Sequence, residues 1–213
     1  VERGDNGRTG DGYFFAGRLV EAAENVAANT TNGYVWLHRG DRDAVDFATS
    51  HHPELGYGQT RSRVDQTPIQ SFYDNEAFGT NTGIIVIKAN PDQGHDVRSV
   101  FDGFLNWETR EGINASYTSH YTFLNVDLVG QRAENGGFSG ATGAGVVFGT
   151  NTFDMVVNGA TIRGFQNAYD LQHNDSTDGV RPQDFRNIAI DSEHSNIRGA
   201  VAAESVGGQL RML

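Results

Sequence analysis

The chain repeats one pattern of apolar and polar positions, in which a small residue precedes a run of alternating apolar residues. In Gly112–Asn125, Gly12–Asn25 and Gly145–Asn158, an asparagine in a second apolar run lies 13 positions after such an opening. A fixed spacing that recurs along a chain is typical of repeat architectures. The six openings are Gly12, Gly33, Gly83, Gly112, Gly145 and Ala168, and the asparagines that follow them are Asn25, Asn75, Asn106, Asn125, Asn158 and Asn187.

The residue types in each unit favour short β-strands. The runs are rich in Val, Ile, Phe and Tyr and are bounded by the turn residues Gly, Asn, Asp and Ser. Units of about 20 residues with two or three short strands predict a parallel β-solenoid. We therefore predict an all-β fold: a right-handed parallel β-helix of about six coils with loop insertions at one corner, in a single domain over residues 1–213. The right-handed sense follows the crossover rule for parallel strands.

Alternation with period two places the first and third residues after each opening on one face of the strand. These residues are almost all apolar, so we expect them to stack as the core. They are Tyr13 and Phe15, Tyr34 and Trp36, Ile84 and Val86, Ile113 and Ala115, Val146 and Phe148, and Tyr169 and Leu171. The intervening residues Val35, Leu37, Ile85 and Ile87 are also apolar, which predicts that the outer face of coils two and three is covered.

The recurrent asparagine has a physical use in such a fold. Asparagine tolerates the left-handed backbone of a tight corner, and stacked amides can hydrogen-bond from one coil to the next. We expect an asparagine ladder; the alternative is simply that asparagine is common in this chain. A second open choice concerns Gly17–Thr30, which fits either a capping helix or two strands. The conserved spacing of 13 residues within the chain favours strands.

Three insertions lengthen the repeat, at about residues 38–69, 89–99 and 172–184. Each lies between the glycine-led strand and the asparagine strand, so all three should leave from the same corner, on coils two, three and six. Coils four and five have short corners and should form the floor of a groove between the loops, with Tyr117, His120 and Tyr121 exposed on it. Loops on a rigid scaffold are where binding and catalysis concentrate.

Histidine and carboxylate residues gather in the insertions and on this floor. Such a set can act as general acid and base or hold Ca²⁺ or a transition metal, and the plain alternative is a set of polar turn residues. The catalytic candidates are His95, Asp96, His120, His173 and Asp175. The substrate-binding candidates are Asn114, Tyr117, Tyr121, Asp170 and Arg110. The metal candidates are Asp175 and Asp178, for which Ca²⁺ is the cofactor that carboxylate oxygens favour.

Charge and composition narrow the classes of partner. The formal net charge is −11, with 16 Lys and Arg against 27 Asp and Glu, which argues against binding to a nucleic-acid backbone. The chain has no cysteine and no apolar run of about 18 residues, so we expect no disulfide and no membrane-spanning helix. Scarce lysine and absent cysteine fit a secreted bacterial protein, and the abrupt start at Val1 fits a piece of a larger one. An anionic polymer would need bridging Ca²⁺ or a basic patch, for which the candidates are Arg98, Arg110, Arg132 and Arg163.

Three segments resemble the β-helix region of the cell-migration-inducing hyaluronan-binding proteins, their transmembrane hyaluronidase relative and bacterial relatives of both. The segments are Pro68–Val86, Ser99–Ala115 and Gly143–Asp191. The resemblance spans about two thirds of the chain and lies mostly in features of the coils. It implies a right-handed parallel β-helix and an extracellular polysaccharide context. Phe78 stands where the animal proteins tend to have histidine, so hyaluronidase activity is not transferred.

Two functions from different classes follow as expectations. The first is a secreted, extracellular domain that binds or processes a polysaccharide; as an enzyme it would be a glycoside hydrolase, lyase or epimerase. Aromatic rings would stack on sugar faces and carboxylates would accept hydrogen bonds from hydroxyls. The second is a non-catalytic structural or adhesive module of a large secreted protein or filament, self-associating end to end. The apolar Leu210, Met212 and Leu213 would suit such a contact.

Overall fold

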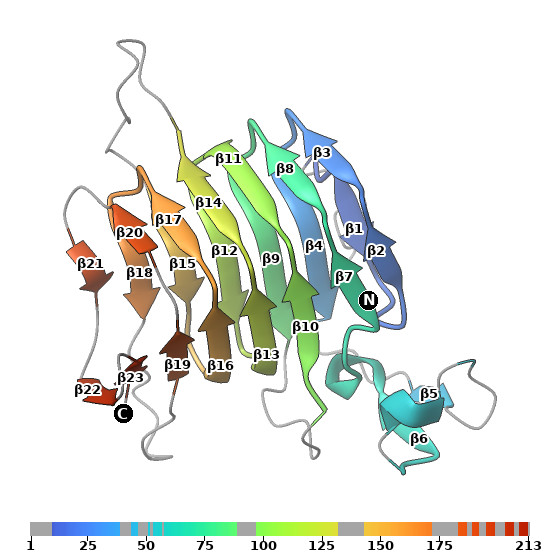
Figure 1. Cartoon of the computed structure of the whole chain (residues 1–213). Coiled ribbons are helices and arrows are strands. Elements are labelled where there is room, and N and C mark those ends of the chain that lie inside the picture. The colour runs from blue at the N-terminus through green and yellow to red at the C-terminus, as the bar shows by residue number, and fades with distance from the viewer. Residues whose placement is uncertain are drawn as a thin grey trace.

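Three sheets of mainly parallel strands make up the fold of this computed structural model (Figure 1). The structure describes residues 10–38, 44–46, 51, 53–56, 58–88, 97–131, 143–171, 183–186, 189–191, 195–198, 203–206 and 209–212. Helical structure in these residues is limited to two short 3₁₀ turns, η1 (Pro53–Gly56) and η2 (Val64–Gln66). A small antiparallel sheet pairs β5 (Ala44–Asp46) with β6 (Arg61–Arg63). The expectation of an all-β fold is confirmed.

The three large sheets, which we call A, B and C, contain their strands in the following order. Sheet A contains β1 (Tyr13–Phe15), β4 (Asn32–His38), β9 (Thr82–Lys88), β12 (Glu111–Ser116), β15 (Ala144–Phe148), β18 (Asn167–Leu171) and β21 (Ser195–Arg198). Sheet B contains β2 (Glu21–Ala23), β7 (Ser71–Tyr73), β10 (Ser99–Asp102), β13 (Ser119–Leu124), β16 (Phe153–Asn158), β19 (Gln183–Arg186) and then the antiparallel pair β23 (Gln209–Met212) and β22 (Ala203–Val206). Sheet C contains β3 (Val26–Ala28), β8 (Glu76–Phe78), β11 (Leu105–Thr109), β14 (Asp127–Gly130), β17 (Thr161–Arg163) and β20 (Ala189–Asp191).

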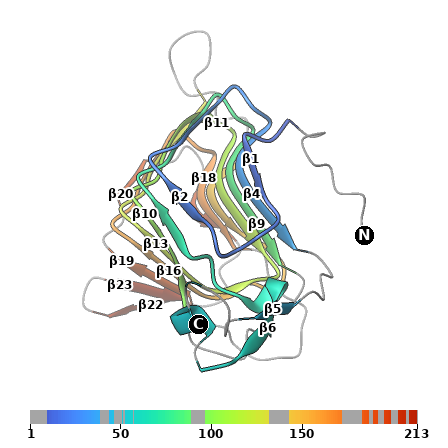
Figure 2. The ribbon, with the colours of Figure 1, turned by 90° about the vertical axis from the view of Figure 1, so that its right-hand side faces the viewer.

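The chain visits the three sheets in turn and then returns to sheet A, beside the strand that it left. We call each such pass a coil. The first coil is β1–β2–β3, the second is β4–β7–β8, and in the described residues the sixth is β18–β19–β20. Figure 2 looks along the stack, where successive coils overlie one another. This order agrees with the units of about 20 residues in the sequence, because parallel strands need a long connection before they can pair.

The residues predicted to point inward form the core. Tyr34, Ile84, Ile113, Val146 and Tyr169 stand opposite one another on successive strands of sheet A, and each is at most 1% exposed. One side chain from each of coils two to six therefore enters the same column, and the partly buried Tyr13 of coil one pairs with Tyr34 at its end. Burial of each large apolar side chain contributes about 1.5–3 kcal/mol, so the stacking of coils is the main source of stability.

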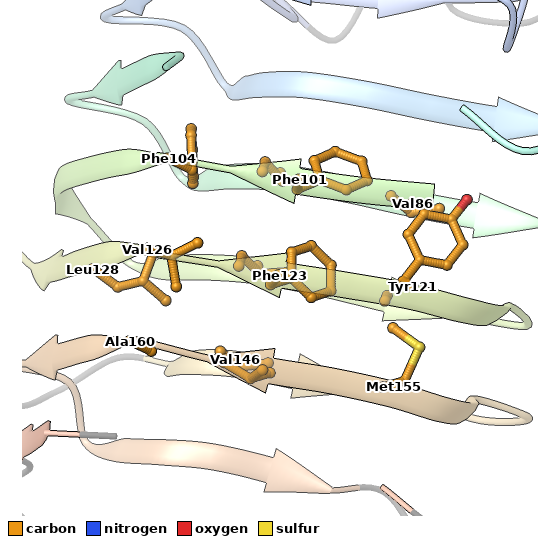
Figure 3. Packing of buried hydrophobic residues seen from close by; sticks show 14 of the residues in the cluster. Val86, Phe101, Phe104, Tyr121, Phe123, Val126, Leu128, Val146, Met155 and Ala160 are labelled. Atoms are coloured by element: carbon orange, nitrogen blue, oxygen red, sulfur yellow. The ribbon is translucent and has the colours of Figure 1, made fainter. Parts of the chain in front are cut away.

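Sheet B and the turns from sheet B to sheet C add columns of their own to this core. The rings of Phe101 and Phe123 lie on neighbouring strands with their centroids 5.2 Å apart. Figure 3 shows Phe104, Val126 and Ala160 one above another on successive coils. The core is thus a continuous apolar stack shared by all three sheets, rather than a layer between two of them.

The glycines that open the second to fifth units lie where sheet C turns into sheet A. A Cβ added at Gly33 would lie 2.5 Å from the carbonyl oxygen of Gly83, and one at Gly112 would lie 2.4 Å from that of Gly145. Both distances are far inside van der Waals contact, so the strands approach this closely only because the position has no side chain. The recurrent glycines of the sequence therefore occur where the backbones of neighbouring coils are crowded.

The asparagine ladder joins Asn25 to Asn75 but does not continue to Asn106 or Asn125, so the expected ladder is wrong for these coils, and Asn187 lies outside the described residues. The side-chain amide of Asn25 donates to Oδ1 of Asn75 at 3.1 Å. In the next coil Phe104 takes this register position, while Asn106 pairs with Ala77. Asn125 sits instead at a left-handed corner with φ 50°. The segment that could have been a helix forms β2 and β3, as its spacing favoured.

The long insertions leave from one corner, as predicted. Residues 39–70 connect β4 to β7, residues 89–98 connect β9 to β10, and residues 172–182 connect β18 to β19, so each joins sheet A to sheet B. Residues 117–118 and 149–152 alone cross the same corner in coils four and five. This A-to-B corner runs along the lower edge of Figure 1, where β13 and β16 begin.

The outer face of sheet A is partly covered in coils two and three. Val35 is buried, whereas Leu37, Ile85 and Ile87 are half-buried. The prediction of a covered face is therefore confirmed for Val35 and only partly for the other three. No helix in the described ranges is long and apolar enough to cross a membrane.

Candidate functional site

A cluster of three charged or titratable side chains lies at the A-to-B corner, on coils three, four and five. Arg98 precedes β10, His120 lies near the start of β13, and Asp154 lies near the start of β16. Nη1 of Arg98 donates to Oδ2 of Asp154 at 2.8 Å, and Nε2 of His120 lies 3.4 Å from the same oxygen. We call these residues the corner cluster.

Strand register brings the members of the corner cluster together. Ser119 pairs with Phe153 and Tyr121 with Met155, so His120 and Asp154 occupy the same position on neighbouring strands. Both have a left-handed backbone, with φ of 62° for His120 and 52° for Asp154. A non-glycine residue in this region is uncommon, and such strain is found preferentially at functional sites. Alternation along β13 and β16 places both side chains on the outer face of sheet B, at adjacent rungs.

The guanidinium of Arg98 spans the cluster and fixes its geometry. Nη2 donates to the carbonyl oxygens of Tyr121 and Asp154, at 2.7 and 2.8 Å, and Nε donates to Oγ1 of Thr122 at 2.7 Å. Charge-assisted bonds of this kind are short and directional. Arg98 therefore ties coil three to coils four and five while it holds the Asp154 carboxylate in place.

The imidazole of His120 is held between Ser119 and Asp154. Nδ1 lies 2.8 Å from Oγ of Ser119, and the ring packs edge-on against Phe153 with centroids 6.3 Å apart. An ionised carboxylate only accepts hydrogen bonds, so the approach to Asp154 favours a proton on Nε2, which leaves Nδ1 to accept from the serine hydroxyl. Ser119 is fully buried, so it orients the ring and is not placed to attack a substrate.

The corner cluster presents an imidazole, a carboxylate and a guanidinium to solvent. The side chains of His120, Arg98 and Asp154 are 16%, 28% and 41% exposed. Within reach of a ligand, the imidazole can donate or accept a proton, the carboxylate can accept hydrogen bonds from hydroxyls, and the guanidinium can bind an oxyanion. Neighbouring rungs of the sheet are about 4.8 Å apart, so a polymer lying across the coils meets one group on each rung.

Two of the predicted floor residues lie at this corner and one does not. His120 belongs to the cluster, and Tyr117 lies beside it on the turn, with φ 51° and its backbone N–H bonded to the carbonyl oxygen of Thr150 at 2.8 Å. Tyr121 is fully buried, and its hydroxyl accepts a hydrogen bond from Arg18. The expectation that Tyr121 is exposed for sugar stacking is therefore wrong, because β13 turns this side chain into the core.

The other substrate-binding candidates lie away from the corner. Asn114 and Asp170 are on the outer face of sheet A, where both pair with Val147 on the strand between them. Arg110 is exposed at the opposite end of β12, where sheet C turns into sheet A. The structure therefore brings Asn114 and Asp170 to one face but does not join either of them, or Arg110, to the corner cluster.

The expected arginine patch does not form among the described residues. Arg98 is in the corner cluster, whereas Arg163 is on sheet C, with its Nη2 3.5 Å from Oδ2 of Asp127. Arg110 lies at a third place, the start of β12. The candidates His95, Asp96, Arg132, His173, Asp175 and Asp178 lie outside the described residues.

Asp154 was missed by reasoning from the sequence. The asparagines Asn125 and Asn158 served as equivalent markers, but Leu124 is the true partner of Asn158, so this alignment is displaced by one residue. Matching the apolar residues that follow His120 and Asp154 would have placed the two side by side, because inward residues alternate after each of them along β13 and β16.

The described residues contain no group of three or more His, Cys, Asp or Glu side chains arranged to hold a metal ion. The metal candidates Asp175 and Asp178 lie outside those residues, so calcium binding stays a prediction.

No known family model, curated protein or solved structure matches the chain. The resemblance to hyaluronan-binding proteins therefore stays an expectation, and the function has to be argued from the site itself.

Proposed function

We propose that this chain is a polysaccharide-binding or polysaccharide-processing domain that acts outside the cell. The observation that carries the proposal is the corner cluster, in which Arg98, His120 and Asp154 lie on three successive coils at the corner from which the insertions leave. Hydroxyl-rich ligands need closely spaced donors and acceptors, and the cluster supplies both. The resemblance to the hyaluronan-binding family supports the same class of ligand.

For the fold, we propose a right-handed parallel β-helix. The support is the visiting order of sheets A, B and C, together with parallel pairing between every two successive coils, as in β9, β12 and β15. Crossover connections between parallel strands are right-handed in almost all proteins. An experimental electron-density map with left-handed coils would contradict this assignment.

A general acid or base role for His120 would make the domain an enzyme. Its ring nitrogen Nε2 lies 3.4 Å from Oδ2 of Asp154, and the side chain is 16% exposed. Most glycoside hydrolases use a pair of carboxyl groups, and the corner cluster as defined contains one, that of Asp154. The cluster by itself therefore supports binding more directly than it supports hydrolysis, and catalysis would draw on further groups.

Calorimetric titration against a panel of neutral and uronic-acid polysaccharides tests the proposal, with sugar release measured in parallel. We expect binding to at least one polymer and its loss in Asp154→Asn, because this change removes the charge that positions Arg98. Repeating the titration with Ca²⁺ and with EDTA tests metal dependence. No binding and no cleavage across the panel would overturn the proposal.

The structural-module alternative is favoured by a separate observation. In the described residues β1, β2 and β3 are the terminal strands of sheets A, B and C, so all three sheets end at the same coil. Terminal strands offer backbone donors and acceptors to another chain. Light scattering tests this alternative: growth of oligomers with concentration would support it, and a strict monomer at high concentration would contradict it.

A further inference from the structure

A second surface is distinguished by its exposed apolar side chains. All the large apolar residues that are exposed in the described part of the chain lie on the outer side of sheets B and C, in the first three coils. They are Val26, Tyr73, Val100, Leu105 and Trp107, at 37–51% exposure. Figure 1 shows β7, β8, β10 and β11, which carry or adjoin most of them, side by side. A concentration of this kind on one face marks an interaction surface, whereas scattered apolar residues do not.

Aromatic rings stand in fixed positions on this surface. The rings of Phe78 and Trp107, on neighbouring strands of sheet C, stack with centroids 4.4 Å apart and planes 11° from parallel. The indole N–H of Trp107 donates to Oε1 of Glu76 at 2.6 Å, and the hydroxyl of Tyr73 donates to Oε1 of Glu21 at 3.4 Å. Carboxylates therefore hold the polar edges of the rings, and the rings are ordered before any partner arrives, which lowers the entropy cost of binding.

The charge on this surface is negative except at its edge, where Arg98 bonds to Thr122, the strand neighbour of Val100, and pairs with Asp154. Residues 19–30, 71–81 and 99–109, which carry sheets B and C in coils one to three, contain no Lys, Arg or His. Their carboxylates are Glu21, Glu24, Asp74, Glu76, Asp102 and Glu108. The pKa of the exposed Tyr73 hydroxyl is raised, chiefly by the negative charge of Glu21, which is the direction expected of a negative local potential. We call the exposed apolar residues, Phe78 and these carboxylates together the acidic aromatic face.

We propose that the acidic aromatic face docks a basic, amphipathic polypeptide segment of a partner protein. Lysine and arginine side chains of the segment pair with the carboxylates and lie against the aromatic rings, in the way that cations bind aromatic faces. Apolar side chains of the segment cover Val100 and Leu105. Charge complementarity selects the cationic partner, and the exposed aliphatic side chains require that the partner also be apolar.

Two other occupants fit the face less well. A polysaccharide would bring hydroxyl groups against the aliphatic side chains of Val26, Val100 and Leu105, which offer no hydrogen bonds in return. A second copy bound symmetrically would place the carboxylates of one face against those of the other, because a two-fold contact uses the same patch twice. A cationic, partly apolar polypeptide leaves no hydroxyl groups unpaired against the aliphatic side chains and brings no carboxylates against those of the face.

The inference does not rest on the proposed function. The corner cluster uses Arg98, His120 and Asp154, whereas Glu21, Asp74 and Glu76 belong to coils one and two. Variants at these three carboxylates therefore leave the corner cluster unchanged. Failure of polysaccharide binding and failure of peptide docking can be observed separately on the same protein.

Fluorescence titration with synthetic peptides tests the proposal on the full chain. The probes are a peptide that alternates lysine with leucine, a lysine-only peptide and a peptide that alternates glutamate with leucine. The chain has two tryptophans, of which Trp36 is fully buried and Trp107 is 37% exposed, so the emission of Trp107 reports on the face. We expect the lysine–leucine peptide to bind, to shift this emission to shorter wavelength and to protect it from acrylamide, and we expect the glutamate–leucine peptide not to bind.

Two variants separate charge from apolar contact. The triple change Glu21→Gln, Asp74→Asn and Glu76→Gln should weaken binding of the lysine–leucine peptide about tenfold or more, since several ion pairs are lost together. A matched triple change elsewhere, Asp46→Asn, Glu111→Gln and Asp170→Asn, alters the net charge equally and should leave binding within about twofold. Circular dichroism and urea unfolding confirm that both proteins fold.

The second variant, Leu105→Ser, keeps the charge and removes apolar area. It should weaken the lysine–leucine peptide and leave the lysine-only peptide unchanged. Equal affinity for the two basic peptides would overturn the proposal, because it would show attraction to any polycation. Displacement of the peptide by a neutral oligosaccharide would also overturn it, as would peptide binding that survives the triple change at the face.

Discussion

The guanidinium of Arg18 donates a hydrogen bond to the hydroxyl of Tyr121, which lies 103 residues further along the chain and three coils away in the stack. Arg18 is 2% exposed, and its Nε also donates to the carbonyl oxygen of Thr67. Its Nη1 has no hydrogen-bond partner among the described residues. A buried charge is costly unless its donors are satisfied. The contact therefore links the first coil to the fourth, and its loss would leave a second donor of Arg18 unsatisfied.

The Arg18–Tyr121 pair predicts a strongly non-additive double-mutant cycle. Tyr121→Phe should destabilise the protein by about 1–3 kcal/mol, because a buried charged donor loses its acceptor. In an Arg18→Met background, the same change should cost less than about 1 kcal/mol, since no charge is left to satisfy. Urea unfolding of the wild type, both single variants and the double variant measures the coupling. Additive effects within about 0.5 kcal/mol would show that the hydrogen bond contributes nothing.

The crowded glycine corner predicts which glycines tolerate a methyl group. Gly112→Ala should destabilise by about 1–3 kcal/mol or more, because its Cβ would press on the backbone oxygen of Gly145 at 2.4 Å. Gly17→Ala is the matched control: its Cβ would meet only Cγ2 of Val20, at 3.8 Å, so stability should be unchanged or rise by about 0.4–1 kcal/mol. Thermal unfolding of the two variants checks this. A Gly112→Ala protein as stable as wild type would contradict the packing explanation.

The sequence predicted the all-β class and the repeating order of parallel strands, because one physical constraint recurs in several coils. Gly33 and Gly112 must lack a side chain where the backbone is crowded, and the residues that follow them must alternate between core and surface. Such positions are visible in a sequence without any structure. Asn25 and Asn125 show the limit of the method. One pairs with an asparagine in the next coil and the other terminates a strand, so a shared residue type concealed two different roles.

The candidate site was predicted only in part, because it depends on register between strands. His120 was visible as a histidine on a short corner, but its partner Asp154 is 34 residues away and appears only when β13 and β16 are aligned exactly to the residue. Tyr121 next to it was misassigned, because the position of β13 was not known to the residue. Ser119, Tyr121 and Phe123 alternate inward along this strand, and an error of one residue exchanges the inner and outer side chains.

The corner cluster predicts a localised loss of polysaccharide binding. Asp154→Asn and His120→Asn should each weaken binding about tenfold or more, since they remove the charge or the imidazole while asparagine still accepts a left-handed backbone. Asp127→Asn is a matched control, because Asp127 is as exposed as Asp154, 42% against 41%, and also pairs with an arginine. Each change should cost less than about 1 kcal/mol of stability.

Calorimetry with the best ligand of the polysaccharide panel measures these effects, and urea unfolding checks the fold. Equal loss of affinity in Asp127→Asn and Asp154→Asn would show that net charge, rather than the cluster, governs binding. Retained affinity in both Asp154→Asn and His120→Asn would remove the cluster from the binding site.

Buried tyrosines predict that stability falls at alkaline pH. Burial raises the pKa of both Tyr34 and Tyr169 above the ordinary value of 10.0, so the folded state holds protons that the unfolded state releases. Stability from these groups is therefore complete below about pH 10 and is lost as the pH rises beyond it, by up to about 1.4 kcal/mol per pH unit for each tyrosine. Urea unfolding between pH 8 and pH 11 measures the slope.

Tyr34→Phe should be less stable than wild type by about 1 kcal/mol at pH 8, because the hydroxyl donates to the carbonyl oxygen of Asn25 at 2.7 Å, yet it should lose less stability toward pH 11. A decline equally steep in wild type and in the Tyr34→Phe, Tyr169→Phe double variant would assign the alkaline loss to other groups.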